Sequence, residues 1–224
     1  MILLVASLYF YAYGEPKFIY ILLASMTLNY FFALGTEKTE NREKLRKAVL
    51  IVGIVVNVAV LFVCKYLNFT ITIIDALFGD ILELLPITLP IGISFYTFQA
   101  ISYLIDVYRK EVKAQKNPVN LALYISFFPQ LIAGPIVRYK TMAEALENRK
   151  ESWSDITYGV RRFLVGLGKK IILSNNLSLI AEYAFGFENY GNLPVVTAWL
   201  GAISFSLQIY FDFSGYSDMA IGLG

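Results

Sequence analysis

Long apolar runs constrain this chain more strongly than any other feature of its sequence. A transmembrane helix needs about 20 consecutive, mostly apolar residues, within a range of about 17–25. Five runs approach this length, and a shorter one begins the chain. The five are Phe18–Leu34, Ala48–Cys64, Pro86–Ile105, Val119–Val137 and Val195–Phe213, and the shorter one is Met1–Tyr13. The sequence therefore predicts an all-α, polytopic integral membrane protein with about five membrane-embedded helical elements.

The composition agrees with a membrane protein. Hydrophobic residues make up 57% of the 224 residues and charged residues 16%, whereas soluble domains average about 45–50% apolar and about 25% charged residues. No basic residue precedes the run Met1–Tyr13, so we interpret it as the end of a span rather than as a secretory signal peptide. The net charge of +2 gives no indication of nucleic-acid binding.

The residue counts also limit the chemistry that these residues can perform. The sequence contains no histidine, which excludes histidine acid–base catalysis and histidine metal sites within it. The single cysteine, Cys64, excludes an intramolecular disulfide and a cysteine-rich zinc site. Motifs of nucleotide hydrolases, serine hydrolases and zinc proteases are absent from the sequence. We therefore predict no catalytic residue, no metal ligand and no bound cofactor here.

Basic residues orient the predicted spans. Seventeen of the nineteen Lys and Arg residues fall in three segments, Gly35–Lys47, Arg109–Lys116 and Arg138–Lys170. Only Lys17 and Lys65 lie elsewhere. Because basic loops stay in the cytoplasm, these three segments are predicted to be cytoplasmic. The connection Tyr66–Leu85 has no basic residue and is predicted to face outward.

The run Val119–Val137 does not fit this alternation, because basic segments flank it on both sides. It also contains Pro129, Gly134 and Pro135. A re-entrant element can keep both flanks in the cytoplasm, and irregular backbone at membrane depth is tolerated where it lines a cavity. We therefore expect Phe127–Pro135 to lie against a cavity open to the cytoplasm. The alternative is an ordinary helix kinked at proline.

The segment Ile156–Leu173 has the pattern of an amphipathic helix. Its apolar residues recur at helical spacing on one face, and its basic residues gather on the other. The apolar residues are Val160, Phe163, Leu164, Leu167 and Ile171, and the basic ones are Arg161, Arg162, Lys169 and Lys170. This pattern predicts a helix in the membrane interface with its basic face toward anionic lipid headgroups.

Polar residues beside the last apolar run are the main site candidates. They are Gln208, Asp212, Ser214, Tyr216 and Asp218. A charge at mid-membrane costs at least about 2.5–3.5 kcal/mol, so such residues are functional candidates. Gln208 and Asp212 are four residues apart and share a helix face. We expect this group to line a tunnel or a substrate path; the alternative is that each aspartate caps a helix or pairs with a buried basic group.

Two further candidates lie in and after the interrupted run. Gln130 is polar within it, and Arg138 follows it. Arg138 is a suitable contact for a phosphate or a headgroup, although an ordinary cytoplasmic anchor explains it equally well. Thr97 and Gln99 are expected to form hydrogen bonds between helices, and Asp106 is expected to pair with Arg109.

Three long segments resemble one known family. They are LPIGISFYTFQAISYLIDVYR (Leu89–Arg109), FFPQLIAGPIVRY (Phe127–Tyr139) and QIYFDFSGYSDMAIGLG (Gln208–Gly224). The chain resembles the membrane-bound O-acyltransferases, specifically the alginate O-acetyltransferase branch. The resemblance implies helices around a tunnel in the bacterial inner membrane, and acetyl transfer from a cytoplasmic donor, acetyl-CoA or another acyl thioester. It also implies periplasmic partner proteins that acetylate an exopolysaccharide.

The sequence departs from this family at one essential point. The family's catalytic histidine lies downstream of the segment that matches Gln208–Gly224. We therefore expect the chain to be the N-terminal part of a single acyltransferase domain, inactive alone, in which Asp212 and Asp218 could orient the missing histidine. The alternatives are a non-enzymatic membrane scaffold and a transporter or acyl conduit.

Overall fold

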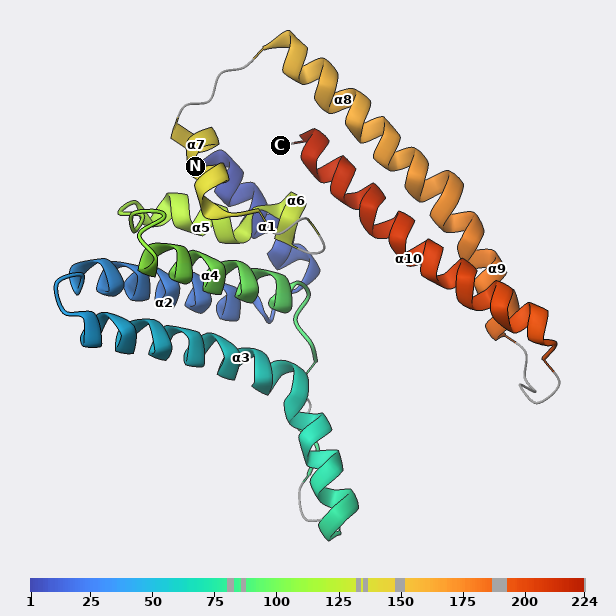
Figure 1. The fold of residues 1–224 in the computed structure, drawn as a ribbon, viewed down its shortest axis with the longest axis horizontal. Coiled ribbons are helices and arrows are strands. Elements are labelled where there is room, and N and C mark those ends of the chain that lie inside the picture. Colours follow the sequence, from blue (N-terminus) through green and yellow to red (C-terminus); the bar gives the residue numbers. More distant parts are fainter. Residues whose placement is uncertain are drawn as a thin grey trace. The chain divides into compact units, whose positions relative to one another are not determined.

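The computed structural model describes residues 1–79, 83–85, 88–131, 134, 137–147, 152–186 and 193–223. Within these residues every regular element is a helix (Figure 1). The chain divides into two compact units, of which the first holds α1 to α7 and the second α8 to α10. The all-α fold predicted from the apolar runs is confirmed. The assignment of the chain to one acyltransferase domain stays a prediction.

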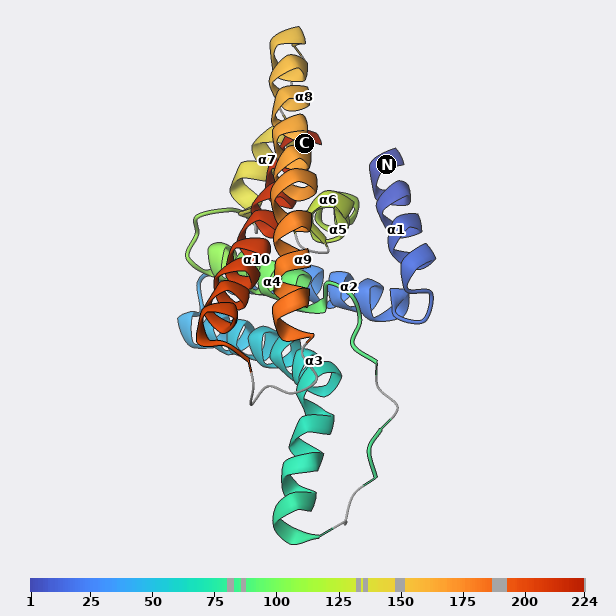
Figure 2. The same ribbon diagram turned by 90° about the vertical axis from the view of Figure 1, so that its right-hand side faces the viewer.

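The first unit is built on three helices that pack side by side. The helices of this unit are α1 (Ile2–Gly14), α2 (Ile19–Lys38), α3 (Glu43–Phe78), α4 (Ile93–Tyr108), α5 (Pro118–Ser126), α6 (Phe128–Leu131) and α7 (Tyr139–Glu147). Helices α2, α3 and α4 contact one another, and the second half of α3 bends away from the other two (Figures 1 and 2). Helices α1 and α5 pack against each other, and α5 also contacts α2.

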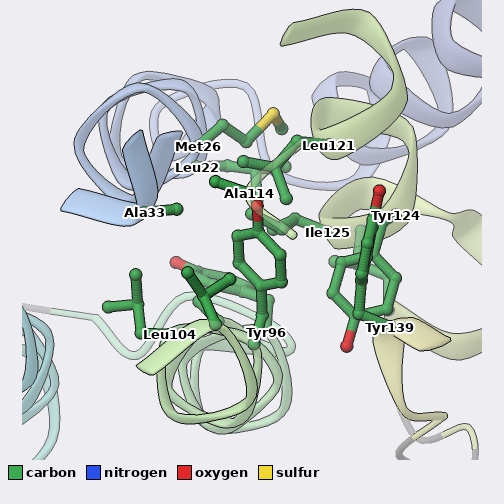
Figure 3. Close-up of a cluster of buried hydrophobic side chains, with 14 of the residues drawn as sticks. Leu22, Met26, Ala33, Tyr96, Leu104, Ala114, Leu121, Tyr124, Ile125 and Tyr139 are labelled. Atoms are coloured by element: carbon green, nitrogen blue, oxygen red, sulfur yellow. The ribbon is translucent and has the colours of Figure 1, made fainter. Parts of the chain in front are cut away.

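The core of this unit lies where α2, α4 and α5 meet. Leu22 and Met26 of α2 approach Leu121 and Ile125 of α5, with Tyr96 of α4 beside them (Figure 3). All five side chains are buried. The core therefore joins segments that are up to about a hundred residues apart in the sequence.

Among the described residues, four helices are long and apolar enough to cross a membrane. They are α2, α3, the continuous helix Trp153–Phe185 and α10 (Val195–Leu223). The spans predicted at Phe18–Leu34, Ala48–Cys64 and Val195–Phe213 correspond to three of these helices. Helix α4 is different, because its 16 residues reach only about 24 Å against a hydrocarbon core of about 30 Å. The predicted span Pro86–Ile105 is therefore wrong in length.

The early part of that run is not helical for a local reason. Gly92 has φ 75°, in the left-handed region, and α4 begins only after it. Such a conformation suits glycine and ends regular right-handed helix on its N-terminal side. Pro86 and Ile87 lie outside the described residues.

The run Val119–Val137 is interrupted, not a continuous kinked helix. Helix α5 begins with Asn117, whose side chain accepts from the N–H of Val119, and with Pro118 in the first turn, a typical helix start. It ends at Ser126, because Phe127 has ψ 112°, and α6 then begins. A re-entrant path through the membrane, and a cavity at Phe127–Pro135, stay predictions. Pro135 itself lies outside the described residues.

The second unit is a pair of long helices packed along each other. Helix α8 (Trp153–Gly168), the π-helical segment η1 (Lys169–Ser174) and α9 (Asn175–Phe185) follow without a break, and α10 contacts all three (Figure 1). The predicted interfacial helix Ile156–Leu173 is thus part of a 33-residue helix long enough to span. The helix is longer than predicted, because amphipathic spacing does not show where a helix ends. Its position in the membrane interface stays a prediction.

Glycines allow the two helices of this unit to touch through their backbones. A Cβ atom placed on Gly166 would lie 2.5 Å from the carbonyl oxygen of Gly215. One placed on Gly159 would lie 2.5 Å from the carbonyl oxygen of Gly222. Small residues at such contacts are typical of helix packing in membranes. The pairing of Gly159 with Gly222 and of Gly166 with Gly215 makes the two helices antiparallel.

Two buried asparagines join α2 to α3. The Nδ2 of Asn29 donates to the Oδ1 of Asn57 at 3.1 Å, and the Nδ2 of Asn57 donates to the Oδ1 of Asn29 at 2.8 Å. Each amide also donates to a main-chain carbonyl one turn earlier, that of Ser25 or of Gly53. The pair therefore satisfies itself inside an apolar interface.

We predict that Asn29→Leu destabilises the protein by about 1 kcal/mol, a typical value for interhelical hydrogen bonds in membranes, because it leaves the Asn57 amide buried without its partner. The double variant Asn29→Leu/Asn57→Leu should recover most of the loss, since removing both polar groups together is nearly neutral. Thermal unfolding in detergent, followed by circular dichroism, measures both. Equal losses in the single and double variants would contradict the prediction.

Candidate functional site

Charged residues concentrate where η1 and α8 face α10. The Asp218 carboxylate accepts from the Nε of Arg162 at 3.1 Å through Oδ1 and from the Nζ of Lys169 at 2.6 Å through Oδ2. Its side chain is only 17% exposed. Asp218 therefore lies between two cations supplied by the neighbouring helix.

A second pair lies six residues earlier on α10. The Nζ of Lys170 donates to the Oδ1 of Asp212, and both side chains are about half exposed. Lys169 and Lys170 are consecutive, and both reach α10 from the start of η1. A π-helical turn holds more residues per turn than an α-helix, which widens the arc that faces the neighbour.

Arg162 is fixed from a second side. Its Nη1 donates to the hydroxyl oxygen of Tyr158 at 2.7 Å. A cavity of about 280 Å³ adjoins these groups and is lined by Tyr158, Arg161, Arg162, Val165 and Asp218. Three of the four polar residues around this cavity, Tyr158, Arg162 and Asp218, are thus joined by hydrogen bonds.

The remaining candidates of α10 lie along the contact with the other helix. The main-chain carbonyl of Gln208 accepts from the hydroxyl of Ser174 at 3.1 Å. The Ser214 hydroxyl is buried and has no hydrogen-bond partner in the part of the chain that the structure describes. Tyr216 is partly buried. The alternative given for the aspartates, pairing with basic groups, is what the structure shows, and a tunnel-lining role for the five residues stays a prediction.

Gln130 and Arg138 belong to the first unit. Gln130 is buried, and its Nε2 donates to the main-chain carbonyl of Tyr124 at 2.8 Å. Gln99 donates to the same carbonyl at 2.7 Å, which confirms its predicted role between helices. The Nη1 of Arg138 lies 3.9 Å from Glu111, and its side chain is 72% exposed. Gln130 thus holds α6 to α5, whereas most of the Arg138 side chain is exposed.

Comparison with known proteins gives this arrangement a context. The model of the membrane-bound O-acyltransferase family matches residues 110–224, which include Arg138 and the charged residues of α8, η1 and α10. The chain belongs to the membrane-bound O-acyltransferase family. This confirms the resemblance drawn from the three sequence segments.

Three relatives indicate the breadth of the family around this chain. A probable alginate O-acetylase AlgI of Pseudomonas syringae is 39% identical over the whole chain and 43% of the relative. A peptidoglycan O-acetyltransferase of Helicobacter pylori is 36% identical over 99% of the chain and 47% of the relative. A teichoic acid D-alanyltransferase of Bacillus subtilis is 29% identical over 59% of the chain and 34% of the relative. The chain spans less than half the length of these relatives.

The sequence analysis did not predict the contacts that Arg46 and Arg109 make in this chain. Arg46 is buried, and its Nη2 donates to the carbonyls of Val107 at 3.1 Å and Tyr108 at 2.5 Å, which satisfies the end of α4. The sequence analysis assigned Arg46 no role beyond being one basic residue of a segment predicted to be cytoplasmic. Arg109 lies 4.0 Å from Glu111 and not in an ion pair with Asp106, so that predicted pair is wrong.

An aromatic cluster was missed as well. The centroid of the Tyr139 ring lies 4.7 Å from that of Tyr103 and 5.1 Å from that of Tyr124. Figure 3 shows Tyr124 and Tyr139. Gln115 ties the cluster together, because its main-chain N–H donates to the Tyr103 hydroxyl and its Nε2 to the Tyr139 hydroxyl. The sequence feature that could have indicated this cluster is the large number of tyrosines, 16 in the chain.

Across the described ranges, no group of three or more Cys, Asp or Glu residues is placed to hold an ion. The carboxylates of Asp212 and Asp218 already face lysine and arginine. The arrangement can fix helices and orient a neighbouring group.

A surface ion pair at the loop ends supplies a pH prediction. A hydrogen bond and the positive charge of Lys110, whose Nζ lies 2.5 Å from Glu40, hold the pKa of the Glu40 carboxyl below its ordinary value. Since the folded pKa is the lower one, the pair contributes stability above the ordinary pKa and loses it as the pH falls through the lowered value. In an NMR titration, Lys110→Gln should raise the Glu40 midpoint toward its ordinary value. Lys113→Gln, the control, should leave it lowered, and equal midpoints in the two variants would contradict the assignment.

Proposed function

We propose that this chain is part of a bacterial inner-membrane, multi-pass O-acetyltransferase. It passes acetyl groups from a cytoplasmic donor, acetyl-CoA or another acyl thioester, toward hydroxyls of an exopolysaccharide or another cell-envelope polymer. Periplasmic partner proteins complete the transfer to the polymer. The proposal rests on family membership together with similarity over essentially the whole chain to an alginate O-acetylase and a peptidoglycan O-acetyltransferase.

The reaction needs a group that these 224 residues do not supply. The acceptor oxygen forms a new bond to the acyl carbon, the carbon–sulfur bond of the thioester breaks, and the acceptor's proton ends on the thiol. A general base with a pKa near the working pH assists such a step, and histidine is absent from the sequence. We therefore expect residues 1–224 alone to be inactive.

Within this proposal the polar residues of α10 have a supporting part. Asp218 offsets part of the positive charge of Arg162 and Lys169 at the helix contact, so these charged groups can remain beside an apolar span. Gln208, Asp212, Ser214 and Tyr216 continue along the same helix. We propose that they line the path of the acyl group. In the first unit, we propose Gln130 and Arg138 as further substrate contacts.

The test is an acetyl-transfer assay on membranes that contain the protein expressed from its complete gene. Radiolabelled acetyl-CoA is supplied from the cytoplasmic side, with alginate or peptidoglycan as acceptor, and base-labile label on the polymer is counted. We expect label on one polymer, and less with Arg138→Ala than with Lys113→Ala, a control in a neighbouring basic segment. Absence of label with every polymer and every acyl thioester would overturn the proposal, as would full transfer by residues 1–224 alone.

A further inference from the structure

An apolar cavity of the first unit lies between α2 and α3. Its volume is about 520 Å³. Tyr20, Ala24 and Leu28 line it from α2, at intervals of four residues, and Val56, Val60 and Cys64 line it from α3 at the same interval. Each wall is therefore one helix face of nine residues, about 13 Å long at 1.5 Å per residue. The floor is Tyr96 and Thr97 of α4. We call this cavity the α2–α3 groove.

The polar amides in the groove do not call for a polar ligand. Asn29 and Asn57 line one end of it. Their Nδ2 groups already donate to each other's oxygen and to main-chain carbonyls. What the groove offers is mainly hydrocarbon surface, and burying such surface is favourable for an apolar chain.

The direction of the groove fits a lipid chain. Both walls are helices long and apolar enough to cross a membrane. They are joined by the short connection 39–42, so they run antiparallel and side by side (Figure 1). The groove follows their axes, which is also the direction of acyl chains in a bilayer. Its rim is open, because Tyr20 of α2 and Val63 of α3 are exposed.

Basic residues stand at one end of this groove. Lys17 precedes Tyr20 by three residues, and Lys65 follows Cys64. Both lysines are exposed. They are also the two basic residues that lie outside the three basic segments, and they lie toward the ends of α2 and α3 away from the connection 39–42. A lysine near the membrane surface attracts anionic headgroups.

From these observations we propose that the α2–α3 groove binds one acyl chain of a membrane phospholipid. The phosphate of that lipid lies at Lys17 and Lys65, in the leaflet opposite to the basic loops. This explains why an apolar groove lies between two spans. It also explains why Lys17 and Lys65 lie outside the three segments that hold the other basic residues. The site uses none of the residues proposed for acyl transfer and does not depend on the proposed function.

The test uses the full chain in nanodiscs that contain phosphatidylglycerol, transferred to detergent and depleted of lipid stepwise. Native mass spectrometry then counts retained phospholipid. Ala24→Phe fills the groove, and Leu23→Phe is its matched control, since Leu23 is an exposed neighbour that does not line it. We expect Ala24→Phe to lower retention about tenfold, because displaced methylenes lose burial, and Leu23→Phe to leave it unchanged. Ala59→Phe and Val58→Phe repeat the comparison on α3.

The headgroup contact is tested separately. Lys17→Gln and Lys65→Gln should each lower retention of phosphatidylglycerol about fivefold, whereas Lys47→Gln, near the start of α3, should not. Circular dichroism and gel filtration identify variants that do not fold, and each pair of variants is compared only when both fold. Retention of no phospholipid by the original chain, as when a protein segment fills the groove, would overturn the proposal. So would equal retention by groove and control variants, or by the three lysine variants.

Discussion

Gly166→Ala is expected to destabilise the contact between α8 and α10 by about 1–3 kcal/mol, the usual range for overpacking a close contact. The added Cβ would lie 2.5 Å from the carbonyl oxygen of Gly215 and 2.8 Å from the main-chain nitrogen of Met219. Both atoms belong to the backbone, so no side chain can rotate away, and the helices must separate. Thermal unfolding of the chain in detergent measures the loss, and larger residues at this position should prevent the packing altogether.

The matched control is two residues away on the same helix. A Cβ on Gly168 would meet no atom within 4 Å. Alanine favours helix over glycine by about 1 kcal/mol, so Gly168→Ala should be neutral or slightly stabilising. Because both substitutions make the same chemical change, their difference isolates the helix contact. If the two variants unfold at the same temperature, the glycine contact does not hold the helices together.

Asp218→Ala is expected to have the second large effect. It leaves Arg162 and Lys169 without the carboxylate that lies 3.1 and 2.6 Å from them, although each remains only one-third exposed. Losing hydrogen bonds to charged groups costs about 1.5–3 kcal/mol. We therefore expect a loss of about 2 kcal/mol in unfolding free energy, with a loss of acetyl transfer in the complete protein.

Asp212→Ala is the comparison for this change. Its pair with Lys170 is about half exposed, and exposed pairs contribute about 0–1 kcal/mol. A substrate-lining role for Asp212 would show as lost transfer with little change in stability. Stability that falls more with Asp212→Ala than with Asp218→Ala would contradict the order of burial described here.

Sequence reasoning predicted the parts of the fold that depend on local properties. Apolar length alone located α2, α3 and α10, because hydrocarbon thickness fixes the length of a span. It failed at α4, where Gly92 delays the helix start. A hydropathy pattern contains no information about one residue's backbone angle, so the shortened helix could not be foreseen.

The charged site shows a different limit. A basic helix face has the same sequence pattern whether it meets lipid headgroups or acidic side chains of another helix. The partners of Arg162 and Lys169 are 49 to 56 residues away in the sequence, and only the fold brings them together. The polar residues of α10 were correctly singled out because charges beside a span are costly, but their pairing was one of two open alternatives.

The contact between Asn29 and Asn57 could have been predicted from the sequence, because polar residues inside spans indicate hydrogen bonds between helices. Both residues stand inside runs that were assigned as spans, where an uncompensated amide is unfavourable. Two such residues in consecutive spans indicate a contact between them. This rule was applied to Thr97 and Gln99 but not to the asparagines.

The π-helical segment determines where the second unit can lose one residue without losing the contacts between its two long helices. Along α10, the contact residues Gly222, Gly215 and Gln208 are spaced by seven, whereas their partners Gly159, Gly166 and Ser174 are spaced by seven and then eight. The extra residue falls at η1, Lys169–Ser174. A one-residue deletion there, for example of Ile172, would restore an ordinary α-helix and keep the same contacts in register. A deletion within α10 would rotate every later contact away from its partner, so only one of the two helices can lose a residue without losing the hairpin.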